Sequence, residues 1–179
     1  MPESQKSSSA PAGKLAIFTA VAAPSLDESG MAGGWTFVEK GTPEELWPAD
    51  FGERLLAASR LTVPFRHEGR SGFSLVTVEF DPGFLVARHS HSSDCLYYIV
   101  AGEIVMGRRV LGAGDGFFLP ADHPYGYRAG PAGVKLLEFR HETSFDTKFH
   151  EKDMARYRAE AEASLTAARA AEGPVDAHD

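Results

Sequence analysis

The stretch that decides the fold runs from Pro82 to Gly102 and reads PGFLVARHSHSSDCLYYIVAG. It begins with a Pro-Gly turn pair, continues through a short apolar run, and reaches two histidines, His89 and His91, separated by one residue. In an extended strand, residues i and i+2 point to the same face. The two imidazoles therefore project together, as two ligands of one metal ion must, although a metal site needs at least a third protein ligand.

Length, charge and cysteine content limit the class of protein. The chain has 179 residues, enough for one domain with a sizeable core. Its net charge of -7 argues against nucleic acid or an anionic membrane as a partner, because both need a concentrated basic surface. The single cysteine, Cys95, allows no intrachain disulfide and suits a reducing compartment. With no apolar run near the roughly 20 residues of a membrane span, we expect a cytoplasmic protein.

Residues 1–45 are expected to form an N-terminal arm. Residues 1–13 are rich in Ser, Pro, Ala and Gly and are predicted to be disordered. Leu15–Ala23 is apolar and faintly resembles a signal peptide; the alternative is a segment that docks on the domain or on a partner. Thr42 and Glu45 form a capping-box pattern, which predicts a short helix that Pro48 interrupts.

Short β-type segments fill residues 46–145, which we predict to be a β-barrel domain. They are rich in β-branched or aromatic residues, and Gly or Pro separates them at spacings of about ten residues. Such spacing predicts a sandwich or barrel. The expected strands are Leu61–Phe65, Phe73–Phe80, Phe84–Ala87, Leu96–Val100, Glu103–Met106, Arg109–Leu111, Gly116–Leu119, Tyr125–Arg128 and Val134–Phe139.

The last part of the chain, 146–179, changes its period. Within His150–Glu172, apolar residues recur at steps of three or four, which predicts an amphipathic helix. Their stripe is narrow and mostly Ala, so we expect the helix on the outside of the barrel or against a second subunit. The residues of this stripe are Met154, Tyr157, Ala161, Leu165 and Ala168.

The opening stretch resembles the first motif of the cupin family. That motif asks for Gly, five residues, His-x-His, three or four residues, Glu, six residues and Gly. Gly83, His89, His91 and Gly102 fit it, and Cys95 stands at the Glu position.

A second cupin motif follows in order. It asks for Gly, five residues, Pro-x-Gly, two residues and His. Gly114 and Pro120 fit, whereas Asp122 stands at the Gly position and Tyr125 at the His position. The resemblance covers about residues 60–140.

The resemblance implies an all-β, RmlC-like fold: a double-stranded β-helix, or jelly-roll barrel, with a C-terminal α-helix and a flexible N-terminal arm. It also implies a divalent metal, Fe, Mn, Ni or Zn, on His89 and His91, with Cys95 and Tyr125 at the other two ligand positions. Nucleotide and flavin cofactors are not expected. The alternative is that the histidines are retained at the barrel mouth without a metal.

Cys95 and Tyr125 each allow two interpretations. A thiolate is a good ligand for Zn or Fe, and Cys at this position resembles the thiol dioxygenases, although those keep a third His. The simpler expectation for a lone buried Cys is a small hydrophobe. Tyr125 would bind a metal or hydrogen-bond a substrate, or else be a half-buried aromatic residue. His123, two residues earlier, is expected to share its face.

Glu138 lies on the last predicted barrel strand, between apolar residues. It would point into the cavity as a ligand, a base or the partner of Arg140 or Arg128, whereas alternation makes an outward polar position the simpler expectation.

Three classes of function are compatible with these residues. The first is a metal-dependent cupin enzyme acting on a small organic acid, such as a non-haem dioxygenase, an isomerase or a lyase, with Tyr125 or Glu138 moving a proton. The second is a small-molecule binding or sensing cupin, with or without a metal. The third is an assembly domain, in which the arm and the C-terminal helix form a homodimer. We expect a small-molecule ligand and a homodimer, without a nucleic-acid or membrane partner.

Overall fold

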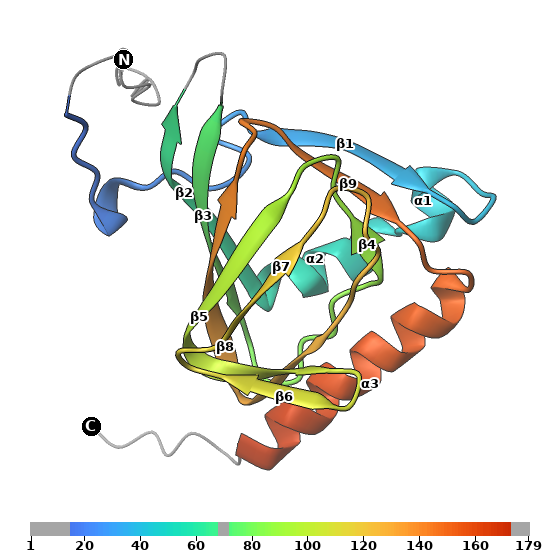
Figure 1. Ribbon diagram of the computed structural model, residues 1–179. Coiled ribbons are helices and arrows are strands. Elements are labelled where there is room, and N and C mark those ends of the chain that lie inside the picture. The colour runs from blue at the N-terminus through green and yellow to red at the C-terminus, as the bar shows by residue number, and fades with distance from the viewer. Residues whose placement is uncertain (1–14, 68–71, 173–179) are drawn as a thin grey trace, which may run out of the picture.

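A computed structural model, which describes residues 15–67 and 72–172, shows two β-sheets around one core (Figure 1). The larger sheet follows the order β2-β3-β8-β5-β6, and β7 pairs with β5. All of its pairings are antiparallel. Its strands are β2 (Ser59–His67), β3 (Phe73–Phe80), β5 (Cys95–Met106), β6 (Arg109–Gly112), β7 (Gly116–Leu119) and β8 (Arg128–Arg140).

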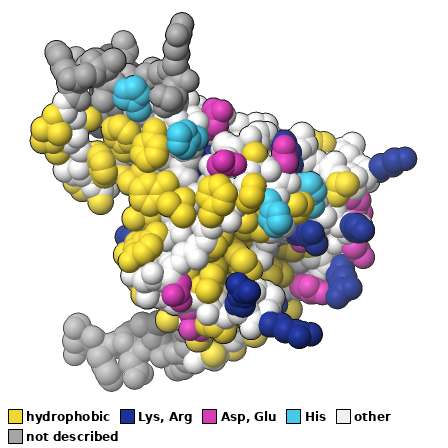
Figure 2. All heavy atoms as spheres, in the orientation of Figure 1, with side chains coloured by type: hydrophobic (Ala, Val, Ile, Leu, Met, Phe, Trp, Pro, Cys, Tyr) yellow, Lys and Arg dark blue, Asp and Glu magenta, His cyan; other side chains and the backbone are white. Residues whose placement is uncertain are grey.

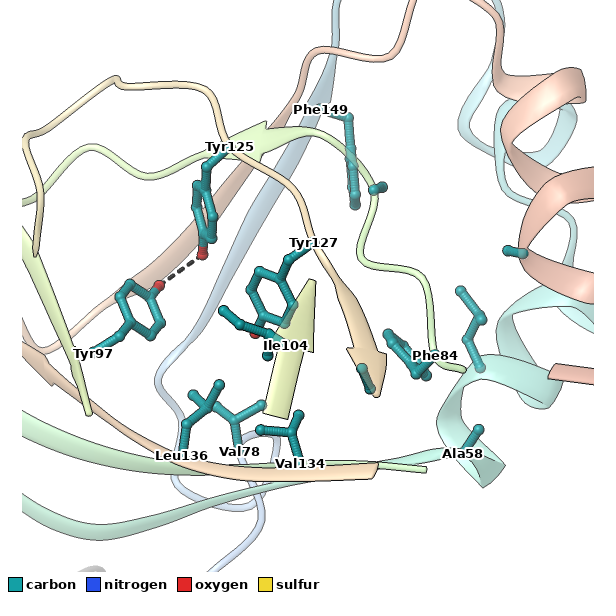
Figure 3. Packing of buried hydrophobic residues seen from close by; sticks show 14 of the residues in the cluster. Ala58, Val78, Phe84, Tyr97, Ile104, Tyr125, Tyr127, Val134, Leu136 and Phe149 are labelled. Carbon is teal, nitrogen blue, oxygen red and sulfur yellow. Dashed lines mark hydrogen bonds between the residues drawn. The ribbon is translucent and has the colours of Figure 1, made fainter. Parts of the chain in front are cut away.

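The smaller sheet has the order β1-β9-β4 and closes the other side of the core. It is built from β1 (Ala32–Phe37), β9 (Phe145–Phe149) and β4 (His89–Ser90). Figure 3 shows Phe149 of this sheet across the interior from Leu136 and Val134 of the larger one. The architecture is therefore the predicted all-β jelly roll with a C-terminal helix.

Most predicted strands are present, and several are longer than expected. Leu96–Val100 and Glu103–Met106 are one strand, β5, because Gly102 carries the chain through a bulge without ending the ladder. Phe84–Ala87 was expected as a strand and forms only an isolated bridge between Leu85 and Arg128. The sequence missed β9, whose three central residues are polar.

The helices cover the ends and one side of the barrel. They are η1 (Ala20–Ala22), α1 (Pro43–Leu46), α2 (Ala49–Ala57) and α3 (Met154–Glu172). The predicted capping box is confirmed, with Thr42 and Glu45 bonding to each other's backbone N–H groups. Pro48 ends the first helix as expected, but it then serves as the N-cap of α2, which the sequence analysis missed.

Helix α3 packs its apolar stripe on the barrel of its own chain (Figure 1). Tyr157 donates its hydroxyl hydrogen to the carbonyl oxygen of Leu85 at 2.9 Å, and Ser164 donates to that of Gly83 at 2.6 Å. The predicted C-terminal helix is thus confirmed, and it begins at Met154 rather than at His150. None of the described helices is long and apolar enough to cross a membrane. The arm residues predicted to be disordered, 1–13, lie outside the described residues.

Gly102 lies where two backbone segments approach most closely. Its φ of 71° is in the left-handed region, and a Cβ atom there would sit 2.1 Å from the carbonyl oxygen of Gly133. Only glycine allows β5 to pass this point. Gly107, in the turn between β5 and β6, has a similar φ of 61° but no atom within 4 Å of its Cβ position.

We expect Gly107→Ala to lower the free energy of unfolding by about 1 kcal/mol, the cost of the left-handed conformation. Gly102→Ala carries the same strain and an added backbone clash, so its loss should be about 2–5 kcal/mol. Urea unfolding followed by circular dichroism measures both. Equal losses in the two variants would show that the clash is relieved without cost.

Candidate functional site

His89 and His91 lie together at the mouth of the barrel. β4 supplies His89, which is paired with Phe149 of β9 and bridged to Tyr125, and His91 follows directly after the strand. The imidazole ring centroids are 4.8 Å apart. Both residues are buried, His89 with 9% and His91 with 4% of its surface exposed. The two imidazoles are therefore side by side at the barrel mouth.

Backbone carbonyl groups fix the tautomer of both histidines. Nδ1 of His89 is 2.7 Å from the carbonyl oxygen of Ala87, and Nδ1 of His91 is 2.5 Å from that of Asp146. A carbonyl oxygen only accepts, so each Nδ1 carries a hydrogen, and each Nε2 of a neutral ring keeps its lone pair. Burial lowers the pKa of His89 to about 3 and also lowers the pKa of His91, so both rings are neutral near pH 7.

Two tyrosines continue from His91 into the barrel. Nε2 of His91 is 3.3 Å from the hydroxyl of Tyr125, which is 2.6 Å from the hydroxyl of Tyr97 (Figure 3). Because Nε2 can only accept, Tyr125 must donate to it, and Tyr97 must then donate to Tyr125. Burial, assisted by Glu138, raises the pKa of both phenols well above the ordinary value, so they remain protonated. The four groups form a relay with one direction, from Tyr97 through Tyr125 and His91 to the carbonyl of Asp146.

The inner faces of β5 and β8 place three more polar side chains near this relay. Cys95 is opposite Arg140, and Tyr97 is opposite Glu138. Glu138 is 2% exposed and accepts a hydrogen bond of 2.7 Å from Nη1 of Arg140. The expectation that Glu138 points outward is wrong, because the even-numbered residues from Val134 to Arg140 face the core and Arg140 neutralises the carboxylate there.

Cys95 lies in the core, 1% exposed. Its thiol donates to the carbonyl oxygen of Ser93 at 3.4 Å. Burial raises the pKa of Cys95 to about 12, with a further contribution from Glu138, so the group is a thiol rather than a thiolate at neutral pH. In this state it is a small buried side chain and a poor metal ligand.

Arg140 is the functional candidate that the sequence analysis considered only as a partner for Glu138. It is 1% exposed, and its guanidinium lies 4.3 Å from the ring centroid of Phe145. Its Nε and Nη2 atoms have no hydrogen-bond partner among the described residues. The carboxylate of Asp146 is 3.8 Å from Nη2 and already accepts two hydrogen bonds from Ser92. One side of a buried guanidinium therefore remains available for an acceptor.

The sequence contained a signal for Arg140. Leu136 is a core position by its apolar surroundings, and a period of two from it puts both Glu138 and Arg140 on the inner face. Applying that alternation from the core residue would have assigned the pair to the interior.

His123 and Tyr125 do not share a face, contrary to expectation. Tyr125 is buried beside the histidines, whereas His123 is exposed. The reason is that the segment before Tyr125 is a turn, in which Asp122 has a φ of 61°, and not an extended strand. Lys148 forms an ion pair with Asp122 at 2.5 Å and helps to hold this turn.

The residues present do not fit the four-ligand metal centre that the family resemblance implies. Among the described residues, no group of three or more His, Cys, Asp or Glu side chains is placed to hold an ion. Tyr125 is a neutral phenol whose hydrogen occupies the lone pair of His91, and Cys95 is a thiol bonded to Ser93. The donor set amounts to two imidazole nitrogens.

Aromatic side chains fill the barrel beneath the histidines. Tyr97 stacks on Phe117 with ring centroids 4.6 Å apart, and the ring of Tyr127 lies 6.2 Å from that of Phe117. Figure 3 shows Tyr97 and Tyr127 in the interior beside Tyr125. A surface cavity of about 660 Å³ is found elsewhere, between the barrel and the start of α3, where Arg88, His150 and Tyr157 are among its lining residues. The relay itself is therefore a closed, packed cluster.

No protein-family model matches the sequence, and a search of curated proteins finds no match. Solved structures with similar folds include KdgF from Halomonas sp., with 23% identity and a TM-score of 0.40, covering 48% of this chain and 81% of that one. An RmlC-like cupin from Shewanella frigidimarina has 25% identity and a TM-score of 0.38, with coverages of 46% and 75%.

A variant of oxalate decarboxylase from Bacillus subtilis has 19% identity and a TM-score of 0.43, covering 49% of this chain. The chain spans only 26% of the length of that enzyme. The strands have a jelly-roll arrangement, and these solved structures align with about half of the chain.

Proposed function

We propose that this chain binds a small organic acid within the buried polar cluster once the side chains that close the cluster move apart, with the carboxylate on Arg140 and the remainder of the molecule against His91 and Tyr125. The observation that supports it is the pair of unbonded N–H groups on Arg140, buried beside the histidine pair. Adjacent guanidinium N–H groups form a fork that matches the two oxygens of a carboxylate.

The energetic argument starts from the cost of burying charge. A buried cation is expensive unless it is paired and hydrogen-bonded on its remaining sides. Glu138 satisfies one edge of Arg140 through Nη1, and Phe145 covers one face. A ligand carboxylate on Nε and Nη2 would satisfy the other edge, so binding a small anion relieves a cost that the folded protein otherwise carries.

The neighbouring groups suit proton exchange with such a ligand. Tyr125 and Tyr97 are protonated and act as donors, while a neutral His91 acts as an acceptor when Tyr125 turns its hydrogen toward the ligand. Glu138 contacts Arg140 and acts by positioning it. Transfer of a proton on the bound acid is the reaction these residues would support, as in an isomerase or a lyase.

A second candidate function is a divalent metal site on His89 and His91 alone. The observation that favours it is that both Nδ1 atoms donate to backbone carbonyls, the arrangement that orients histidine ligands and leaves Nε2 for the ion. Water or an organic acid would have to complete the coordination, and Tyr125 would have to release Nε2 of His91.

Arg140→Lys keeps the charge and removes the fork, so the dissociation constant for a bound carboxylate should rise about tenfold or more. Titrations with formate, acetate and oxalate, followed by calorimetry, measure this change. In the wild-type protein the Nε–H resonance of Arg140 should shift as the acid is added, which tests the contact even if the variant folds poorly. Arg60→Lys, in an exposed ion pair with Glu79, is the matched control. Absence of saturable binding by all three acids contradicts the proposal.

Elemental analysis of the purified protein tests the second candidate. A stoichiometric Fe, Mn, Ni or Zn ion that is lost in His89→Ala and in His91→Ala would support it. A protein that is purified without metal and takes up none when each ion is added would exclude it. The two proposals can be tested separately, because a chelator removes any metal ion and the carboxylate titration can be run in its presence.

The neutral histidines predict acid sensitivity in the chelator-treated protein. Below pH 6.5 the unfolded chain takes up a proton on His89, whereas the folded chain does not until the pH approaches 3. Stability is therefore full above pH 6.5 and falls as the pH decreases, by up to about 1.4 kcal/mol per pH unit for each such histidine. Urea midpoints between pH 7 and 5 should show a shallower slope for His89→Gln than for the wild type. Identical slopes would mean that the folded protein protonates His89 freely.

A further inference from the structure

We propose that the surface cavity between the barrel and the start of α3 binds a small phosphate monoester that carries an apolar group. The cavity has a volume of about 660 Å³, which is typical of small-molecule sites. It is separate from the buried cluster around Arg140. Side chains alternate along β4, so His89 faces the core whereas Ser90 faces His150, which lines the cavity.

The carboxylates around the cavity are already committed to groups of this chain. Glu151 accepts a hydrogen bond of 2.6 Å from the backbone N–H of Arg88. Asp153 accepts one of 2.9 Å from the backbone N–H of Arg156, near the positive end of the α3 dipole. Glu160 forms an ion pair of 2.8 Å with Nε of Arg156. These acidic groups hold the wall of the cavity together, and within the described part of the chain they form no cluster placed to hold a metal ion.

Two cations that line the cavity remain unpaired. The guanidinium of Arg88 and the ammonium group of Lys152 are exposed and have no hydrogen bond or ion pair within residues 15–67 and 72–172. Figure 2 shows Lys and Arg side chains, together with Asp and Glu, on the side of the molecule where Figure 1 places α3. Two unpaired positive charges favour a ligand group with two negative charges. A phosphate monoester carries close to two at neutral pH, whereas a carboxylate carries one.

His150 adds a third donor to the same cavity. Its Nε2 is 2.8 Å from the hydroxyl of Ser90, which is fully buried. This hydroxyl has no other hydrogen-bond partner among the described residues, so it donates to Nε2 and the ring carries its own hydrogen on Nδ1. The Nδ1–H group is therefore available to a ligand. Arg88, Lys152 and His150 together match the three acceptor oxygens of a phosphoryl group.

Apolar side chains form another part of the cavity wall. Val38 is 60% exposed, and Leu85 and Pro124 are half-buried. Tyr157 donates its hydroxyl hydrogen to the carbonyl oxygen of Leu85 at 2.9 Å, so its ring offers apolar surface to a ligand. Inorganic phosphate would leave this surface in water. An aromatic or aliphatic group on the ester oxygen would cover it and add hydrophobic binding energy.

The donors for the phosphoryl group are side chains and not the end of α3. The backbone N–H of Met154, the first residue of this helix, already donates to the carboxylate of Glu39 at 2.6 Å. Arg88 precedes β4, whereas His150 and Lys152 precede α3. The backbone N–H of His150 donates to the carbonyl oxygen of Arg88 at 2.7 Å, which holds the two segments side by side. The site is therefore organised before a ligand arrives.

Titration of the full chain with phenyl phosphate, followed by calorimetry and by the ring resonances of His150, tests the site. We expect saturable binding and a shift of the Nδ1–H resonance. Arg88→Gln and Lys152→Gln should each raise the dissociation constant about tenfold, the effect of losing one charge-assisted hydrogen bond. Both side chains are exposed, and circular dichroism checks that both variants fold. Arg109→Gln removes an exposed cation on β6, outside the cavity, and should bind as the wild type does.

Inorganic phosphate and benzoate test the two parts of the ligand separately. Benzoate keeps the ring but has a single charge, and inorganic phosphate keeps the charge but has no ring, so each should bind about tenfold more weakly than phenyl phosphate. Equal affinity for either one would overturn the proposal. Phenyl phosphate that does not bind saturably, or that binds Arg88→Gln and Lys152→Gln as tightly as Arg109→Gln, would overturn it as well.

Discussion

Strand β5 runs antiparallel to β8, with Cys95 opposite Arg140 at one end and Val105 opposite Arg128 at the other. Because side chains alternate across a strand, this one ladder assigns residues to both faces of the large sheet. Inside, it sets Tyr97 against Glu138 next to the relay. Outside, it sets Leu96 against Phe139. A slip of one residue would exchange these two sets, so the polar cluster and the apolar face depend on the same register.

Burial determines the protonation states of the polar side chains on the inner face of the sheet. The same desolvation keeps His89 neutral, holds the phenol of Tyr125 protonated and makes Cys95 an ordinary thiol. Arg140 is the exception, since a guanidinium stays charged in proteins whatever its surroundings and must find acceptors instead. The cluster thus combines neutral donors and acceptors with a single buried ion pair that is satisfied on one edge.

The sequence alone predicted the fold well and the site less well. Turn residues such as Gly102, the spacing of short strands and the histidine pair are local patterns. They can be recognised in the sequence because they do not depend on contacts between distant segments. Two kinds of feature were not predicted. Strand β9, the middle strand of the smaller sheet, has three polar residues between its two Phe residues, so its sequence shows little apolar pattern. Glu138 was expected to face outward because a carboxylate is rarely buried without a partner. Its partner, Arg140, lies two residues further along the same face of the strand. That pairing can be predicted only if the alternation is counted from a residue known to be in the core.

The relay from Tyr97 to Asp146 has a further consequence. Every hydrogen in it is committed, because the carbonyl of Asp146 can only accept. If His91 gained a proton, Nε2 would become a donor, and Tyr125 would have to turn its hydrogen toward Tyr97, which would then need another acceptor deeper in the barrel. A single charge arriving at the mouth therefore reverses the polarity of two buried hydrogen bonds, and the hydroxyl of Tyr97 reports an event that takes place two side chains away.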